Sequence, residues 1–172
     1  GRTPWKVALA VAGLAAFAAF WTWALFFASK EPINAIGDDA WTARAEQICV
    51  AADEERLALA DFREMQDATP ELVRERADIV DAATDVIERM LDDVVAVTPA
   101  STKGQDLIPQ WEADYRNYIG SRRVFADDLR ATGENTAFFE PEAGGIPVSE
   151  KLEVFAADNE MATCAPPRDL RR

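Results

Sequence analysis

The two cysteines, Cys49 and Cys164, are the residues whose chemistry is easiest to anticipate. One lies in the first segment expected to form a soluble helix, and the other lies near the C-terminus. A pair this far apart is typical of a structural disulfide in an oxidising compartment, and the CxxC spacing of redox enzymes is absent. The alternative is two free core thiols in a cytosolic domain. If the cysteines pair, the chain-entropy model predicts a stabilisation of about 4 to 5 kcal/mol.

Carboxylates are the other reactive groups, because the sequence contains no histidine. The lack of histidine excludes the Ser-His-Asp and Cys-His nucleophiles and the histidine-ligated zinc, di-iron and haem sites. Adjacent acids remain, such as Asp92-Asp93 and Asp127-Asp128. A glycosidase needs two carboxyl groups facing each other across about 5 to 9 Å, whereas neighbours on a helix point about 100° apart. We therefore expect no enzyme activity, no metal and no cofactor.

An aromatic stripe, Trp111, Tyr115 and Tyr118, recurs at helical spacing. Such a stripe is usually part of a core. It could instead line a pocket for a lipid or a sugar, which would make the domain a ligand-binding module.

These groups must be positioned by helices, since the chain after Gly37 has helical periodicity and helix-stop signals. Asp38 and Asp39 are candidate N-caps for a first amphipathic helix to about Ala68, with Leu59 and Phe62 on its buried face. Thr69-Pro70 restarts the chain as a second helix, ending near Val97. A third helix is expected from about Asp106 to Ala131, followed by Gly133. A short fourth helix begins at Ser149 and ends near Met161.

The loop from Glu134 to Val148 contains two prolines and two glycines and is long for a compact domain. It carries Phe138 and Phe139, which would be costly to leave in water. We expect them either to cap the bundle or to contact a partner.

One stretch, Val7 to Ala28, is uncharged and almost entirely apolar. As a helix it would be about 33 Å long, enough to cross a hydrocarbon core of about 30 Å. It is longer than the h-region of a removable signal peptide, so we expect a retained membrane anchor. The sequence thus predicts an all-α protein: an N-terminal transmembrane helix followed by an antiparallel three- to four-helix bundle.

Alanines recur at intervals of three and four residues along the predicted anchor and form one small-residue face. In lipid such a face lets another helix approach closely, although alanine is also common throughout this chain. The residues of this face are Ala8, Ala12, Ala15, Ala16 and Ala19.

Charge constrains the partners and the orientation. The formal net charge is −13, and every acidic residue follows the apolar stretch. Phosphate backbones would repel such a domain, so we expect no nucleic acid among its partners.

Basic residues flank the stretch evenly, with Arg2 and Lys6 before it and Lys30 and Arg44 after it, so the positive-inside rule does not decide the orientation. The expected disulfide favours a cytoplasmic N-terminus and an extracytoplasmic domain at the plasma membrane.

The expected organisation has five parts. A cytoplasmic stub covers residues 1–6, the transmembrane helix 7–28 and a juxtamembrane connector 29–38. The helical bundle covers 39–165, and a basic tail covers 166–172.

Three segments carry a resemblance to a group of proteins. These are WTARAEQIC from Trp41 to Cys49, the preceding FFASKEPINAIGDDAW, and the later FAADNEMATCAPP. They resemble actinobacterial single-pass membrane proteins with an extracytoplasmic helical domain. Such small anchored proteins look like accessory subunits of large membrane machines.

The resemblance implies a non-catalytic accessory or assembly subunit. It would bind an integral membrane complex through the anchor and the extracytoplasmic domain, with the lipid bilayer as its surroundings. A mycobacterial cell entry (Mce) type lipid importer is the leading candidate for that complex. The alternatives are the respiratory cytochrome supercomplex as the partner, or a lipid- or solute-binding receptor module.

Overall fold

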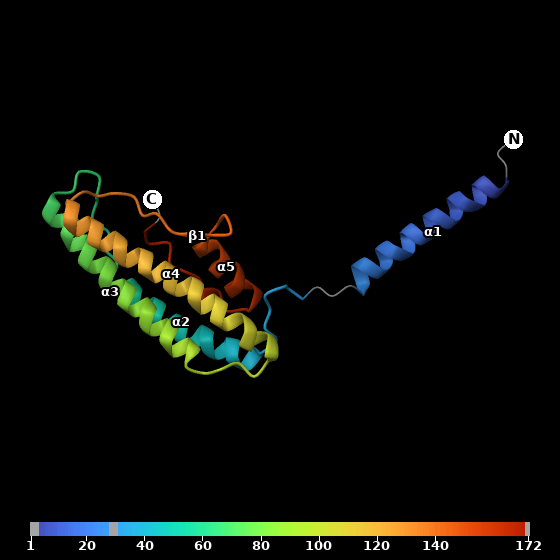
Figure 1. Cartoon of the computed structure of the whole chain (residues 1–172), viewed down its shortest axis with the longest axis horizontal. Coiled ribbons are helices and arrows are strands. Elements are labelled where there is room, and N and C mark those ends of the chain that lie inside the picture. The colour runs from blue at the N-terminus through green and yellow to red at the C-terminus, as the bar shows by residue number, and fades with distance from the viewer. Residues whose placement is uncertain (1–3, 28–30, 171–172) are drawn as a thin grey trace. The chain divides into compact units, whose positions relative to one another are not determined.

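The computed structural model describes residues 4–27 and 31–170. Within them the protein is all-α apart from one hairpin whose two strands have two residues each (Figure 1). The helices are α1 (Pro4–Phe26), α2 (Asp39–Ala58), α3 (Pro70–Val95), α4 (Thr102–Thr132), α5 (Val148–Asp158) and a 3₁₀ turn, η1 (Ala162–Cys164). Strand β1 (Glu142–Ala143) pairs antiparallel with β2 (Ile146–Pro147). The chain divides into two compact units, Gly1–Pro32 and Ile33–Arg172, which are described separately.

In the first unit, α1 carries most of the predicted anchor, and none of its residues is buried. Its length and composition would allow it to cross a membrane. The last residue of the predicted span, Ala28, lies outside the described residues, as do parts of the expected stub, connector and tail (residues 1–3, 29–30 and 171–172).

The second unit is a helical bundle with α3 and α4 as its long antiparallel pair (Figure 1). α2 packs against α3, and α5 packs against α4. The predicted start of α3 is confirmed: Thr69 accepts a hydrogen bond from the Leu72 N–H at 3.4 Å, and Pro70 occupies the first turn. Gly133 ends α4 at φ 66°, a left-handed conformation that glycine adopts without strain.

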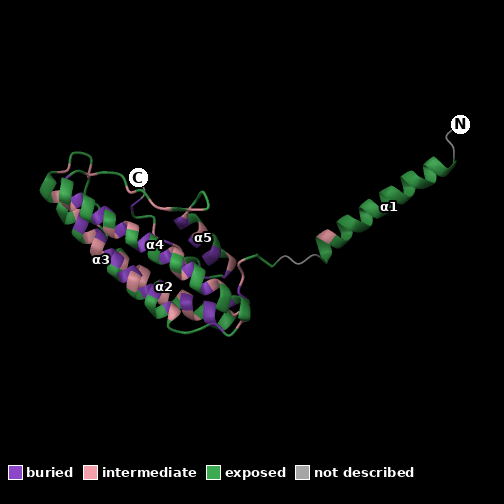
Figure 2. Cartoon of the chain, viewed as in Figure 1, coloured by how far each residue is buried: buried purple, intermediate pink, exposed green. Residues whose placement is uncertain are grey.

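The core follows the helix faces that point inward (Figure 2). A larger cluster joins α2, the second half of α3, α4, α5 and Cys164, and a smaller one joins the start of α3 to the end of α4 and Leu170. All buried residues of both clusters lie between Ile36 and Leu170, so this unit has a core of its own.

The first soluble helix ends ten residues earlier than the sequence suggests, at Ala58 instead of Ala68. The side chain of Asp61 provides the reason, since its carboxylate accepts hydrogen bonds from the Arg63 backbone N–H (3.0 Å) and guanidinium (2.9 Å). This local turn competes with helical hydrogen bonding. The expected burial of Leu59 and Phe62 is therefore wrong: they are 37% and 92% exposed.

The third soluble helix begins earlier than predicted, at Thr102, because Ser101 caps it by accepting a hydrogen bond from the Gly104 N–H at 3.0 Å. Pro109 consequently lies inside α4. A Cβ on Gly104 would lie 2.7 Å from the Pro99 Cβ, so the tight turn before α4 requires glycine there.

A ladder of ion pairs connects α3 and α4 along their length. Arg116, Arg123 and Arg130 are spaced seven residues apart on α4 and face acids on α3. Arg116 lies 2.9 Å from Asp92, Arg123 lies 3.0 Å from Glu88 and 3.2 Å from Asp81, and Arg130 lies 3.0 Å from Asp78. Arg123 also pairs with Asp85, and Arg130 with Asp81. We call this set the α3–α4 ladder.

Both expected flanks of the bundle in fact pack against it. In the connector, Ile36 is buried and its N–H donates to the Asn159 side chain at 2.8 Å. In the tail, Leu170 is buried and Asp169 binds Arg122. The contacts of the second unit thus include Ile36, Asp169 and Leu170, which flank the expected bounds of 39–165.

Candidate functional site

The disulfide joins α2 to the C-terminal segment. Cys49 and Cys164 are bonded and fully buried. The Glu46 carboxylate, one turn before Cys49, accepts hydrogen bonds from the Thr163 N–H (3.0 Å) and hydroxyl (2.6 Å). The bond is thus surrounded by contacts that hold the same two segments together, as expected of a structural crosslink.

The aromatic stripe on α4 is core. Trp111, Tyr115 and Tyr118 are all buried, and the Trp111 ring stacks on Phe155 at 5.8 Å between centroids. The Tyr115 hydroxyl donates to the Cys164 carbonyl (3.2 Å), and the Tyr118 hydroxyl donates to the Pro167 carbonyl (3.0 Å). Burial raises the pKa of the Tyr115 hydroxyl, which stays a neutral donor. The stripe therefore anchors the C-terminal segment to α4.

The indole N–H of Trp111 is buried, and it has no hydrogen-bond acceptor among the residues that the structure describes. A smaller pocket of about 310 Å³ borders Trp111 between α4 and α5. Because the indole nitrogen itself is shut off from solvent, a molecule in that pocket would touch the ring without reaching the N–H group.

Next to the stripe, Arg122 is a fully buried cation. Its guanidinium makes two hydrogen bonds to the Asp169 carboxylate, at 2.8 and 2.9 Å, and its Nε donates to the Thr84 hydroxyl at 2.9 Å. Desolvation raises the pKa of the Asp169 carboxyl, but the hydrogen bonds and charge of Arg122 outweigh it and hold that pKa below its usual value. The pair holds the last described residues against α4.

The two loop phenylalanines, Phe138 and Phe139, differ in how far they are buried. Phe138 packs edge-on against Phe125 (5.5 Å) and Tyr118 (6.1 Å), so it covers the bundle. Phe139 points away and is 85% exposed. Of the two rings, only that of Phe139 is largely exposed.

The alanines of the small-residue face, Ala8, Ala12, Ala15, Ala16 and Ala19, all lie on α1 and are all exposed. Bulky side chains on the rest of this helix, such as Leu14 and Phe17, are exposed as well. The alanine face and the bulky side chains of α1 are thus alike in being exposed within this unit.

In each of the adjacent carboxylate pairs, Asp92-Asp93 and Asp127-Asp128, the first aspartate forms an ion pair with an arginine of the α3–α4 ladder. Asp92 binds Arg116, and Asp127 lies 3.3 Å from Arg130. Among residues 4–27 and 31–170, no group of three or more Cys, Asp or Glu side chains is arranged to hold a metal ion.

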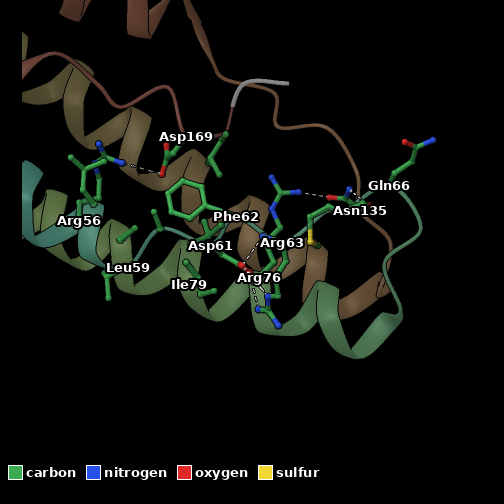
Figure 3. Close-up of a pocket in the computed structure, with 16 residues that line it drawn as sticks. Arg56, Leu59, Asp61, Phe62, Arg63, Gln66, Arg76, Ile79, Asn135 and Asp169 are labelled. Atoms are coloured by element: carbon green, nitrogen blue, oxygen red, sulfur yellow. Dashed lines mark hydrogen bonds and ion pairs between the residues drawn. The ribbon is translucent and has the colours of Figure 1, made fainter.

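The second unit also contains a pocket of about 780 Å³, which we call the Phe62 pocket (Figure 3). It lies between the end of α2, the segment 59–66, the first half of α3 and the C-terminal segment. Ile79, Val80, Ala83 and Leu170 supply apolar walls, and Figure 3 shows Phe62 in the middle of the lining residues. Arg56, Arg63 and Arg76 line it together with Asp61 and Asp169.

Sequence reasoning missed this pocket, because it placed Leu59 and Phe62 on the buried face of a continuous helix. The Asp61-x-Arg63 spacing, which forms the local turn, was the available signal. Comparisons with family models, with curated proteins and with solved structures found no match.

Proposed function

We propose that the protein is a membrane-anchored, non-catalytic accessory subunit of a larger membrane complex. α1 serves as a single-pass anchor with a cytoplasmic N-terminus, and the bundle lies on the extracytoplasmic side of the plasma membrane. One observation carries the proposal: α1 is long and apolar, none of its residues is buried, and the bundle has a core of its own.

The apolar surface of α1 supports the anchoring role, since exposing such a helix to water is costly. Trp21 and Trp23 near its end and Trp5 near its start are ring types that settle among lipid headgroups. The alanine face gives this anchor a side on which another transmembrane helix can pack closely.

The disulfide supports the extracytoplasmic location of the bundle. Structural disulfides persist in oxidising compartments and are rare in the cytosol. With Cys49 and Cys164 bonded inside the core, the second unit fits the outer side of the membrane.

For the partner complex we propose an Mce-type lipid importer, on the resemblance to anchored actinobacterial proteins. The respiratory cytochrome supercomplex is the alternative. Lateral packing of α1 and contact of the exposed Phe139 with an extracytoplasmic surface would together hold the subunit in place.

Copurification tests whether α1 packs against a partner complex. The tagged protein would be purified in a mild detergent from an actinobacterial host. The tagged wild type at native abundance should bring down importer subunits in constant proportion. The Ala12→Leu/Ala16→Leu variant should lose them, because the bulkier face keeps the helices apart. Leu14→Phe, on the same helix outside the alanine face, is the matched control and should retain them.

Recovery of the wild-type protein alone would contradict the accessory role. Recovery of cytochrome subunits in place of importer subunits would identify the respiratory supercomplex as the partner.

Membrane topology is tested separately with a single added cysteine at Val124, which is 61% exposed on α4. A membrane-impermeant maleimide should label Val124→Cys in intact cells. Labelling only after lysis would place the bundle in the cytoplasm.

A further inference from the structure

We propose that the Phe62 pocket binds a single-chain anionic amphiphile, with the hydrocarbon chain on its apolar floor and the acidic head among its arginines. This inference concerns the bundle alone and does not depend on what α1 packs against.

The floor of the pocket is hydrocarbon in character. Its lining includes three buried side chains, Val80, Ala83 and Leu170, and two half-buried ones, Ile79 and Met65. A sugar would need several converging polar groups on such a floor, whereas an acyl chain needs only apolar contact. The volume of about 780 Å³ falls within the range of about 300 to 1,000 Å³ typical of small-molecule sites.

The mouth of the pocket has uncovered apolar side chains. Phe62, Leu57 and Leu59 all line it and are 92%, 54% and 37% exposed. Isolated exposed apolar residues are ordinary, but three of them around one apolar hollow mark a surface that gains from being covered. A chain lying between the Phe62 ring and the α3 wall would remove both from water.

The charges on the pocket wall favour an anionic head. Three arginines, Arg56, Arg63 and Arg76, line the pocket beside two carboxylates, Asp61 and Asp169. Arg56 and Arg63 also pair with Asp53 (2.5 Å) and Glu75 (2.6 Å), so these two cations are already balanced and an anionic head would be held by their remaining N–H donors. A guanidinium offers five N–H donors, so it can bind a further carboxylate while keeping its present hydrogen bonds.

Photolabelling of the full chain tests the proposal. The protein would be reconstituted in phosphatidylcholine nanodiscs and irradiated with a palmitic acid that carries a diazirine on its chain. After reduction and tryptic digestion, adducts are expected on peptides 57–63 and 77–89, which contain the mouth and the floor. Unlabelled palmitate should compete for these adducts more strongly than hexadecanol, which has the same chain without the charge.

Two variants address the pocket and one serves as a control. Phe62→Ser changes an almost fully exposed residue, so folding should be intact, and labelling of both peptides should fall by about tenfold, equivalent to about 1.4 kcal/mol. Ile79→Trp should lower labelling of both peptides, because the larger ring narrows the apolar floor. Val124→Trp, on an exposed position of α4 away from the pocket, should label like the wild type.

Equal thermal midpoints by circular dichroism will show that each variant is folded. Adducts confined to residues 4–27, or adducts on 57–63 and 77–89 that are as abundant in Phe62→Ser and Ile79→Trp as in the wild type, would overturn the binding site. Equal competition by palmitate and hexadecanol would overturn the anionic head.

Discussion

At the scale of single residues, the buried guanidinium of Arg122 needs a nearby opposite charge, because a buried charge without a partner is costly. Its side chain is fully inaccessible, and its charge is balanced by a carboxylate only three residues from the C-terminus. A buried charge that loses its partner is strongly destabilising, whereas replacing both partners by apolar groups is often neutral. The stability of the bundle should therefore depend on Asp169, a residue that the sequence assigns to a tail.

Asp169→Ala should lower the free energy of unfolding by about 3 kcal/mol, because Arg122 would remain buried without its carboxylate. Urea unfolding followed by circular dichroism measures this. Asp128→Ala, at an exposed position of α4, is the control and should change stability by less than about 0.5 kcal/mol. The double variant Arg122→Met/Asp169→Leu should be more stable than Asp169→Ala, and a double variant as unstable as the single one would refute the assignment.

The same pair predicts a pH dependence. The pKa of the Asp169 carboxyl is lowered in the folded state, so the unfolded chain takes up its proton first as the pH falls. The stabilisation is therefore fully present above the usual aspartate pKa of about 3.9 and is lost as the pH drops through the folded value. Urea midpoints between pH 6 and pH 3 should fall less steeply for Asp169→Asn than for the wild type, and parallel curves would contradict this.

The two loop phenylalanines predict opposite outcomes. Phe138→Ala should destabilise the bundle by about 2 kcal/mol, because its half-buried ring covers Phe125 and Tyr118. Phe139→Ala should change stability by less than about 0.5 kcal/mol, since that ring is exposed. Thermal unfolding of the two variants compares them directly, and equal losses would show that Phe138 is not the capping ring.

At the scale of elements, the α3–α4 ladder lies along the contact between the bundle's two longest helices. The seven-residue spacing of Arg116, Arg123 and Arg130 matches two helical turns, so each arginine meets acids of α3 on one line. The acids of this line, Asp78, Asp81, Asp85, Glu88 and Asp92, recur at every turn of α3, so a shift by one turn would keep most of the arginines opposite an acid. The ladder therefore balances charge along the seam without selecting one register.

Arg123→Met should cost about 1 kcal/mol in 0.1 M salt, a value at the upper end for exposed ion pairs because three acids share this arginine. The loss should shrink at about 1 M NaCl, where the Debye length falls to about 3 Å. Arg74→Met is the control, since Arg74 meets only Glu71 at 4.0 Å. A loss that stays the same in high salt would indicate that Arg123 acts through packing.

Sequence patterns predicted these elements where local signals were strong. Thr69-Pro70 and Thr132-Gly133 marked the boundaries of α3 and α4 closely because caps and prolines act locally. The end of α2 was missed because Leu59 to Met65 contains good helix formers without glycine or proline. There the turn at Asp61 and the return of the chain into α3 override propensity, and the Phe62 pocket forms in the space that results.

At the scale of the whole molecule, the disulfide was predictable from two cysteines, whereas the packing of the C-terminal segment was not. The partners of that segment, Tyr115, Tyr118 and Arg122, lie on α4, about fifty positions away in sequence. No local pattern reports a contact at such a separation. The structure thus assigns residues 166–170 to the bundle, which the sequence alone could not do.

Cys49→Ala/Cys164→Ala should lower the free energy of unfolding by about 4 kcal/mol, because the bond closes a loop with a sequence separation of 115. Guanidinium unfolding of the oxidised and reduced wild type provides the control, since reduction should reproduce the effect of the variant. A wild-type midpoint that does not respond to reduction would contradict a structural role.

The crosslink also determines how the second unit would respond to mechanical load. Asn34 and Ile36 are hydrogen-bonded to Asp158 and Asn159, so the chain just before α2 is held against the end of α5, and the bond between Cys49 and Cys164 joins α2 to the segment that follows. Tension applied between residue 33 and the C-terminus would pass through residues 33–49, cross the sulfur atoms and leave along 164–170. Residues 50–163 lie outside this covalent path, but Asp169 and Leu170 lie on it and line the Phe62 pocket, so the pull would act on that pocket directly.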